Sequence, residues 1–174
     1  MARQLGNTSL VFRIIPYEIP TFKELRLPPA LNNFARFHSG IVLVTGPTGS
    51  GKSTTIASLI DLINKNERKH IITIEDPIEF IYSNKNCIIT QRQVEIDTVS
   101  FPEGVKYALR QDPDVILIGE IRDMETLTSA MKAAETGHLV IASLHTNDAI
   151  QTVSRIVGMF EPSDRDNVRK QLAE

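Results

Sequence analysis

The nine residues GPTGSGKST, at positions 46–54, constrain the fold of this chain more than any other stretch. They fit the pattern G-x-x-x-x-G-K-[ST], in which a glycine-rich turn joins a strand to a helix and its backbone N–H groups surround phosphate oxygens. The flanking residues supply that context, since IVLVT at 41–45 reads as a strand and apolar residues follow Lys52 at helical spacing. The sequence therefore predicts a phosphate-binding loop in an α/β domain.

The residue types of this loop point to a nucleotide and a metal ion. Gly49 and Gly51 allow the backbone to turn toward an anion, and the N-terminus of the next helix adds partial positive charge. We expect Lys52 to reach the β and γ phosphates, Ser53 to bind Mg²⁺, and Thr54 to donate to the α phosphate. ATP and Mg²⁺ are the expected cofactors, and the expected binding residues are Gly46, Pro47, Thr48, Gly49, Ser50, Gly51, Lys52, Ser53 and Thr54.

Strand-like and helix-like segments alternate along the rest of the chain. The strand-like runs are 41–45, 70–75, 114–119 and 138–144, and helices are expected over 28–37, after Lys52, after Ser100, over 124–136 and from Asp148. IITQRQV, at 88–94, reads as irregular, whereas DVILIG at 114–119 is apolar on both faces, as in a central parallel strand. The sequence predicts an α/β fold with a mainly parallel sheet and helices on both faces.

The N-terminal segment reads differently from the remainder. LVFRII, at 10–15, predicts a short strand that Pro16 closes, and a proline-containing connector follows it. We expect residues 1–27 to be the end of a truncated N-terminal domain with its linker. Residues 28–174 are then a nucleotide-binding domain that is incomplete at its C-terminus, because RKQLAE still reads as helix.

The composition limits the class of partner. A net charge of -2 and a pI near 6.1 argue against a broad basic face, so no nucleic acid partner is expected. A single cysteine, Cys87, is expected to pack as a small apolar side chain. There is no signal peptide pattern and no run of about 20 apolar residues, so we expect a cytoplasmic protein.

Carboxylates follow two of the expected strands. Glu75, Asp76 and Glu79 come after the strand at 70–75, and Glu120 comes after the strand at 114–119. Ligands of open parallel sheets bind beyond the carboxyl ends of the strands, where such groups can orient water or metal; the alternative is strand-end solvation or helix capping. Gly119 stands where an aspartate commonly binds the metal, so we expect Glu120 to reach Mg²⁺ through water.

Two histidines bracket the last expected strand in GHLVIASLHTND, at 137–148. His138 and His145 are seven positions apart, so a regular strand directs them to opposite faces. His145 lies at the carboxyl end, where phosphates bind, and is expected to sense the γ phosphate. His138 lies at the remote end and is expected to be a packing or intersubunit residue.

Four segments, GPTGSGKST, EDPIEF, RQDPDVILIGEIRD and TGHLVIASLHTND, resemble in order and spacing the secretion ATPase superfamily, the hexameric motors of type II secretion and type IV pili. EDPIEF, the QRQV-x-x-DT-x-SF stretch at 91–101 and AAETGHLV are most similar to the retraction ATPases of type IV pili. The resemblance implies a RecA-like P-loop core, preceded by a PAS-like domain of which residues 1–27 are the end. The four segments are then the Walker A, Asp box, atypical Walker B and His box motifs.

The same resemblance implies roles for individual residues. Glu79 is the favoured general base, Glu120 positions metal or water, and His138 and His145 serve the His box, while Glu75 and Asp76 are secondary candidates. Members of the superfamily also place arginines from the N-terminal domain and a neighbouring subunit at the nucleotide. The candidates here, each with a surface ion pair as its alternative role, are Arg13, Arg92, Arg110 and Arg122.

The function implied is Mg²⁺-dependent ATP hydrolysis in a homo-hexameric ring that drives pilus retraction and twitching motility. The ring would act at the cytoplasmic face of the inner membrane, against an inner-membrane platform protein of the pilus. The alternatives are a pilus assembly or type II secretion ATPase, a nucleic-acid translocase of similar fold, and a non-catalytic nucleotide-binding module.

Overall fold

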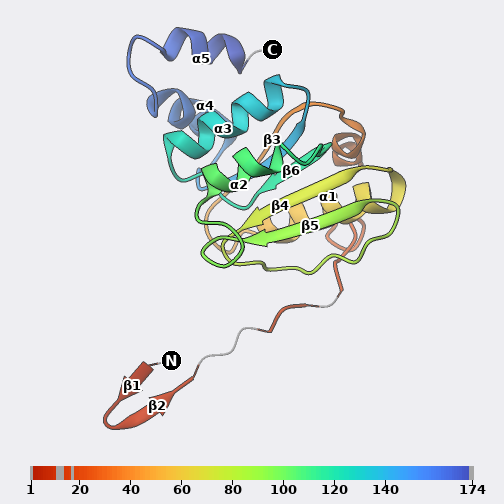
Figure 1. Cartoon of the computed structure of the whole chain (residues 1–174), viewed down its shortest axis with the longest axis vertical. Helices are drawn as coiled ribbons and strands as arrows, with labels where there is room; N and C mark the ends of the chain where they lie inside the picture. The colour runs from red at the N-terminus through yellow and green to blue at the C-terminus, as the bar shows by residue number, and fades with distance from the viewer. Residues whose placement is uncertain (1, 11–13, 17, 173–174) are drawn as a thin grey trace.

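The computed structural model describes residues 2–10, 14–16 and 18–172. A parallel sheet with helices on both faces forms its main body (Figure 1). The elements in chain order are β1 (Ala2–Gln4), β2 (Asn7–Ser9), the 3-10 helix η1 (Pro29–Arg36), β3 (Gly40–Thr45), α1 (Lys52–Asn66), β4 (His70–Glu75), β5 (Ile88–Gln93), α2 (Phe101–Ala108), β6 (Val115–Ile118), α3 (Met124–Glu135), β7 (Leu139–Leu144), α4 (Ala149–Gly158) and α5 (Arg165–Gln171).

The main sheet has five strands in the order β3-β7-β6-β4-β5, and every neighbouring pair is parallel. Two apolar cores lie on its opposite faces, because successive side chains of a strand point to opposite sides. On β4 and β7, Ile72 and Val140 pack with the core that includes residues of α2, α3 and α4, whereas Ile71 and Leu139 pack with α1 and η1. The predicted α/β class, the parallel sheet and the helices on both faces are confirmed.

The sequence-based prediction was wrong at β5. Residues 88–94 were expected to be irregular, but Ile88–Gln93 is a regular strand that pairs with β4 in parallel. β5 is an edge strand whose side chains are only partly buried. Polar residues such as Gln91 and Gln93 are therefore tolerated there, and they hide the apolar pattern that reveals a buried strand.

The N-terminal prediction also needs correction. Residues 11–13 of the expected strand at 10–15 lie outside the described residues, and Leu10, Ile14 and Ile15 belong to no strand. Upstream of them, β1 and β2 form an antiparallel hairpin whose turn contains Gly6 at a φ of 80°. The division of the chain at residues 27 and 28 stays a prediction.

The sheet brings the predicted site residues to one edge. The register pairs Thr45 of β3 with Leu144 of β7, and Ile118 of β6 with both Ile74 of β4 and Ala142 of β7. The residues that follow these four strands therefore emerge side by side. In the described part of the chain, no helix combines the length and the apolar character needed to cross a membrane.

Candidate functional site

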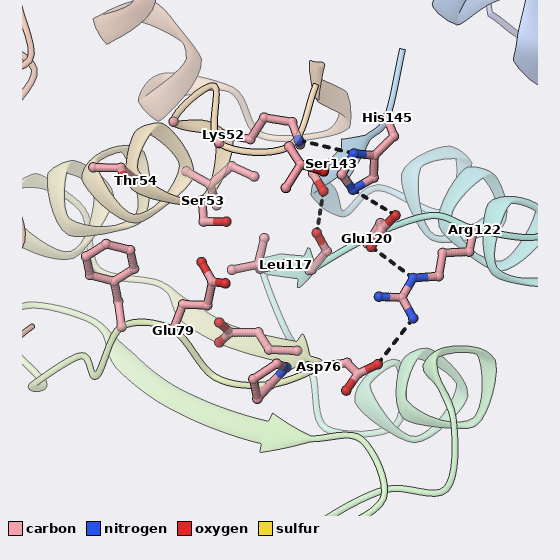
Figure 2. Close-up of a pocket in the computed structure, with 18 of the residues that line it drawn as sticks. Lys52, Ser53, Thr54, Asp76, Glu79, Leu117, Glu120, Arg122, Ser143 and His145 are labelled. Carbon is pink, nitrogen blue, oxygen red and sulfur yellow. Dashed lines mark hydrogen bonds and ion pairs between the residues drawn. The ribbon is translucent and has the colours of Figure 1, made fainter. Parts of the chain in front are cut away.

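A cavity of about 580 Å³ lies at this edge of the sheet (Figure 2). Segments that follow β3, β4, β6 and β7 all contribute to its wall. The predicted residues that line it are Thr48, Gly49, Gly51, Lys52, Ser53, Thr54, Glu75, Asp76, Glu79, Glu120, Arg122 and His145. The carboxylates, the loop and His145 thus share one cavity.

The glycine-rich loop turns in the way its sequence predicts. Gly49 and Gly51 have φ values of 78° and 91°, in the left-handed region that disfavours residues with a Cβ atom. Gly46 has a φ of 152°, and a Cβ atom there would lie 2.5 Å from the Ser50 hydroxyl oxygen. Pro47 accepts a hydrogen bond from the Ser50 N–H, and Gly46, Pro47 and Ser50 shape the loop without lining the cavity.

The ammonium group of Lys52 has three partners, which equals its number of N–H donors. Lys52 Nζ lies 2.9 Å from the Gly46 carbonyl, 3.0 Å from the Pro47 carbonyl and 3.5 Å from His145 Nδ1. The side chain is buried at the first turn of α1. The ammonium group is therefore held between the first residues of the glycine-rich loop and His145.

His145 links this lysine to the carboxylate that follows β6. His145 Nε2 lies 3.0 Å from Oε1 of Glu120, and the other ring nitrogen faces Lys52. A carboxylate only accepts and an ammonium only donates, so both contacts are satisfied when the neutral ring carries its proton on Nε2. One imidazole ring thus joins a cation and an anion that both line the cavity.

Arg122 extends this chain of contacts to the residues after β4. Its Nε donates to Oε2 of Glu120 at 2.9 Å, and its Nη1 lies 3.4 Å from Oδ2 of Asp76. The hydrogen bond with Glu120 and the charge of that carboxylate raise the pKa of Arg122. Figure 2 shows the resulting line of contacts from Lys52 through His145 and Glu120 to Asp76.

Glu75 and Glu79 form a pair of neighbouring carboxylates. Glu75 is buried, and burial raises its pKa even though Thr73 Oγ1 donates to its Oε1 at 2.6 Å. The backbone N–H of Glu79 also donates to the Glu75 carboxylate, while the Glu79 charge raises the pKa of Glu75 further. Figure 2 shows the Glu79 carboxylate pointing into the cavity toward Ser53.

Gly119 has a steric reason to lack a side chain. A Cβ atom there would lie 3.3 Å from the Cα atom of Glu75 and 3.4 Å from the Ile74 carbonyl oxygen, against the backbone of β4. The Gly119 carbonyl also accepts a hydrogen bond from Ser143 Oγ at 2.6 Å. An aspartate fits poorly at this position, which leaves Glu120 as the first carboxylate after β6.

The donor set of the cavity suits a magnesium ion held mainly by phosphate and water. Four carboxylates line the cavity, against the charges of Lys52 and Arg122. The described residues contain no group of three or more His, Cys, Asp or Glu residues able to hold a metal ion. Mg²⁺ typically keeps several waters and takes only one or two protein ligands beside substrate phosphates, so Ser53 and Glu120 fit that role.

Three of the remaining candidates, His138, Arg92 and Arg110, do not line the cavity. His138 Nδ1 lies 3.0 Å from the Ala133 carbonyl, near the C-terminal end of α3, and its packing or intersubunit role stays a prediction. Arg92 donates to the side chain of Gln111, and the Arg110 guanidinium lies 5.8 Å from the centre of the Tyr107 ring. Neither arginine lines the cavity of its own chain. Arg13 lies outside the described residues.

The sequence interpretation missed several residues of the site. Ser143 lines the cavity beside His145, and Phe80, Tyr82 and Phe101 add apolar wall. Gln91 was overlooked as well, although its Nε2 donates to Oε1 of the buried Glu75 at 3.2 Å. The available signal was the pair Gln91 and Gln93, two positions apart. It could be interpreted only if β5 was first recognised as a strand next to β4.

Known proteins resemble this chain in sequence and in fold. Type IV pilus retraction ATPase PilT from Pseudomonas aeruginosa is 49% identical over 171 residues, 98% of this chain and 50% of that protein. Type II secretion system protein E from Aeromonas hydrophila is 47% identical over 133 residues, 76% of this chain and 26% of that protein. The crystal structure of the pilus retraction motor PilT with bound ADP matches with a TM-score of 0.90 and 54% identity, covering 92% of this chain and 47% of that one.

These matches are consistent with one another. The chain spans about half the length of the PilT proteins that it matches. The family described as type II/IV secretion system protein matches residues 7–172, nearly the whole chain. The solved structure supports the RecA-like core that the resemblance implied. The chain therefore belongs to the type II/IV secretion system protein family.

Proposed function

We propose that the protein is a Mg²⁺-dependent ATPase that works as a hexameric motor in type IV pilus retraction. The observation that carries the proposal is the cavity in which the glycine-rich loop and the Lys52 ammonium face the carboxylates of Glu79 and Glu120. A P-loop alone is compatible with many phosphoryl-transfer reactions. The opposed carboxylates add what hydrolysis requires, a group able to orient water and accept its proton.

In the proposed mechanism, backbone N–H groups of residues 48–53 and the Lys52 ammonium bind the phosphates of ATP. Lys52 exchanges some of its present contacts with the Gly46 and Pro47 carbonyls for phosphate oxygens. Mg²⁺ would be held by the Ser53 hydroxyl and, through water, by Glu120, and it would offset negative charge on the phosphates. Glu79 then takes the proton of the water that attacks the γ phosphorus, as the bond to ADP breaks.

His145 is the proposed sensor of the γ phosphate. Its ring contacts both Lys52 and Glu120. A movement of Lys52 when the γ phosphate leaves would therefore alter the contact between His145 and Glu120. Its backbone carbonyl also accepts a hydrogen bond from Arg155 of α4 at 3.2 Å. This connection gives the nucleotide state a route to a helix that lies outside the cavity.

Retraction is favoured over the alternatives by the extent of the similarity. The match to the retraction ATPase covers 98% of this chain, whereas the match to the secretion protein covers 76%. The EDPIEF and QRQV segments also resemble the retraction type most. The identities of 49% and 47% are nevertheless close, so pilus assembly or type II secretion remains the second candidate.

The proposal extends to assembly and location. The ring would work at the cytoplasmic face of the inner membrane against a pilus platform protein, with no nucleic acid partner. The cavity has an excess of carboxylates even before ATP adds its own negative charge. Mg²⁺ would offset part of this charge, and we propose Arg13, Arg92 and Arg110 as candidates to supply further cations to a neighbouring subunit.

Deletion of the gene in its natural host tests the direction of the motor. Loss of a retraction motor leaves pili extended, so electron microscopy should show more pili per cell and twitching should stop. Complementation with the intact gene should restore both properties, and complementation with Lys52→Ala should restore neither. Cells without pili would contradict retraction and support the assembly motor.

Substitution of Glu79 tests the proposed base. Glu79→Gln keeps the size of the side chain but cannot accept the proton, so kcat should fall about 100-fold or more while nucleotide affinity stays within about twofold. The matched control is Glu135→Gln, at an exposed position on α3. An unchanged kcat in Glu79→Gln would transfer the role of base to Glu120.

A further inference from the structure

The segment that carries Glu79 is irregular, although the proposed chemistry requires it to be well positioned. Residues 76–87 connect β4 to β5 and form neither a helix nor a strand. Polar backbone groups in such a segment need partners from elsewhere in the molecule. The partners for the part around Glu79 come from the side chains of β5.

Gln91 supplies three of these contacts with one amide group. Its Oε1 accepts from the backbone N–H of Tyr82 at 2.9 Å, and its Nε2 donates to the Phe80 carbonyl at 2.9 Å. The same Nε2 donates to Oε1 of Glu75 at 3.2 Å. The amide therefore contacts the chain on both sides of Glu79, at Glu75 four residues before it and at Phe80 and Tyr82 one and three residues after it.

Gln93, two residues further along β5, also contacts the segment that carries Glu79. Its Oε1 accepts from the backbone N–H of Ile78 at 3.3 Å. Residues two apart on a strand project from the same face, so Gln91 and Gln93 reach the same segment. The register sets their positions, since Gln91 pairs with Thr73 and Gln93 with Glu75 on β4.

The pattern of donors and acceptors at Gln91 requires an amide. One side of the group meets an N–H donor, and the other side meets two oxygen acceptors. A carboxylate has no donor for the two oxygens, and an apolar side chain of similar size can form none of the three bonds. The position of the segment around Glu79 therefore depends on an amide side chain at residue 91.

We infer that Gln91 is a positioning residue for ATP hydrolysis, which fixes the Glu79 segment and the buried Glu75 carboxylate relative to the nucleotide loop. The Glu79 N–H donates to that same carboxylate, so Gln91 acts on Glu79 both through the backbone and through Glu75. The inference rests on the proposed function, because it assumes that Glu79 serves the reaction. Gln91 itself does not line the cavity.

Steady-state ATP hydrolysis by the intact protein tests the inference. Gln91→Met should lower kcat about tenfold to 100-fold and leave the KM for ATP within about twofold, because a misplaced reactive group costs rate more than binding. Gln151→Met, on an exposed residue of α4, is the matched control and should keep the normal kcat. A normal kcat in Gln91→Met would overturn the inference, and so would an increase in KM with kcat unchanged.

A double variant separates this inference from the assignment of Glu79. If Gln91 acts through Glu79, adding Gln91→Met to Glu79→Gln should reduce kcat by less than twofold, because the group being positioned is already absent. A loss that multiplies the two single effects would overturn the inference. A normal kcat in Glu79→Gln alone would instead refute the role of Glu79, whatever Gln91→Met does.

Hydrogen exchange provides a readout that does not depend on turnover. Gln91→Met removes the acceptor of the Tyr82 N–H, so exchange in the peptide that contains residues 78–82 should accelerate at least about tenfold, whereas Gln151→Met should not change it. Unchanged exchange would overturn the inference. Gln91→Glu, which retains the acceptor but not the donor, is the second variant if Gln91→Met does not fold, and the same loss of kcat is expected.

Discussion

The Nε2 atom of His145 lies 3.0 Å from Oε1 of Glu120. This contact joins the residue after β7 to a residue that follows β6, and Nδ1 of the same ring faces the Lys52 ammonium. The histidine therefore contacts the proposed phosphate ligand on one side and the proposed metal-positioning carboxylate on the other. A substitution of His145 should therefore change the rate of ATP turnover.

Replacing His145 should slow turnover without abolishing folding. His145→Ala removes the acceptor of Lys52 and the donor to Glu120, so we expect kcat to fall about tenfold to 100-fold, as is typical when a group that orients a metal-positioning residue is lost. The matched control is His138→Ala, because His138 contacts the end of α3 and not the cavity. Steady-state kinetics of both variants should therefore show a large loss only for His145→Ala. Equal losses in both would refute the separation of roles.

The connection between β4 and β5 is also attached to α1, through Asn64. This buried side chain donates to the Ser83 carbonyl at 2.8 Å and accepts from the backbone N–H of Lys85 at 3.0 Å. Asn64→Ala leaves both groups without that partner, so the free energy of unfolding should fall by about 1–3 kcal/mol in denaturant titrations. Asn66→Ala, which removes only an exposed contact within α1, should cost less than about 1 kcal/mol. Similar losses in the two variants would contradict the attachment.

The buried carboxylate of Glu75 should make stability depend on pH. Burial raises its pKa above the ordinary value of 4.5, so the folded protein holds this proton more tightly than the unfolded chain does. The resulting contribution to stability is complete below the unfolded pKa and is lost as pH rises through the folded pKa. Relative to the wild type, Glu75→Gln should therefore gain free energy of unfolding as pH rises from the unfolded pKa of Glu75 through its folded pKa.

Urea titrations at a series of pH values measure this difference. Glu135→Gln removes an exposed carboxyl group and serves as the control, for which we expect no comparable trend. A difference between Glu75→Gln and the wild type that stays constant or falls with increasing pH would show that the carboxyl group is not held at a raised pKa.

The sequence predicted the parts of the molecule whose physical cause is local. Gly49 and Gly51 occur where the chain needs positive φ angles, and Ser100, Asp123 and Asp148 each cap the N-terminus of a helix through a side-chain oxygen. The parallel topology alone also predicts that the residues following the strands lie at one edge of the sheet. The cluster of Lys52, Glu79, Glu120 and His145 was predictable for that reason.

The sequence did not reveal contacts that depend on neighbouring strands. The strand β5 was missed because an edge strand carries polar side chains, and without β5 the contacts of Gln91 to Glu75 and Phe80 could not be inferred. Likewise, the steric reason for Gly119 is visible only when β6 lies beside Glu75 of β4. Arg92 and Arg110 had the right charge for the site, but Arg92 on β5 and Arg110 just after α2 do not line the cavity.

ATP turnover by a Lys52 variant of the intact protein tests whether this cavity is the site of ATP hydrolysis. Lys52→Ala removes the ammonium that the loop directs at the phosphates, so kcat/KM should fall at least about 1000-fold, while Lys132→Ala, an exposed lysine on α3, should keep wild-type turnover. We expect that Lys52→Ala folds normally and hydrolyses no measurable ATP. Undiminished hydrolysis by folded Lys52→Ala would contradict the assignment of this cavity as the site of the reaction.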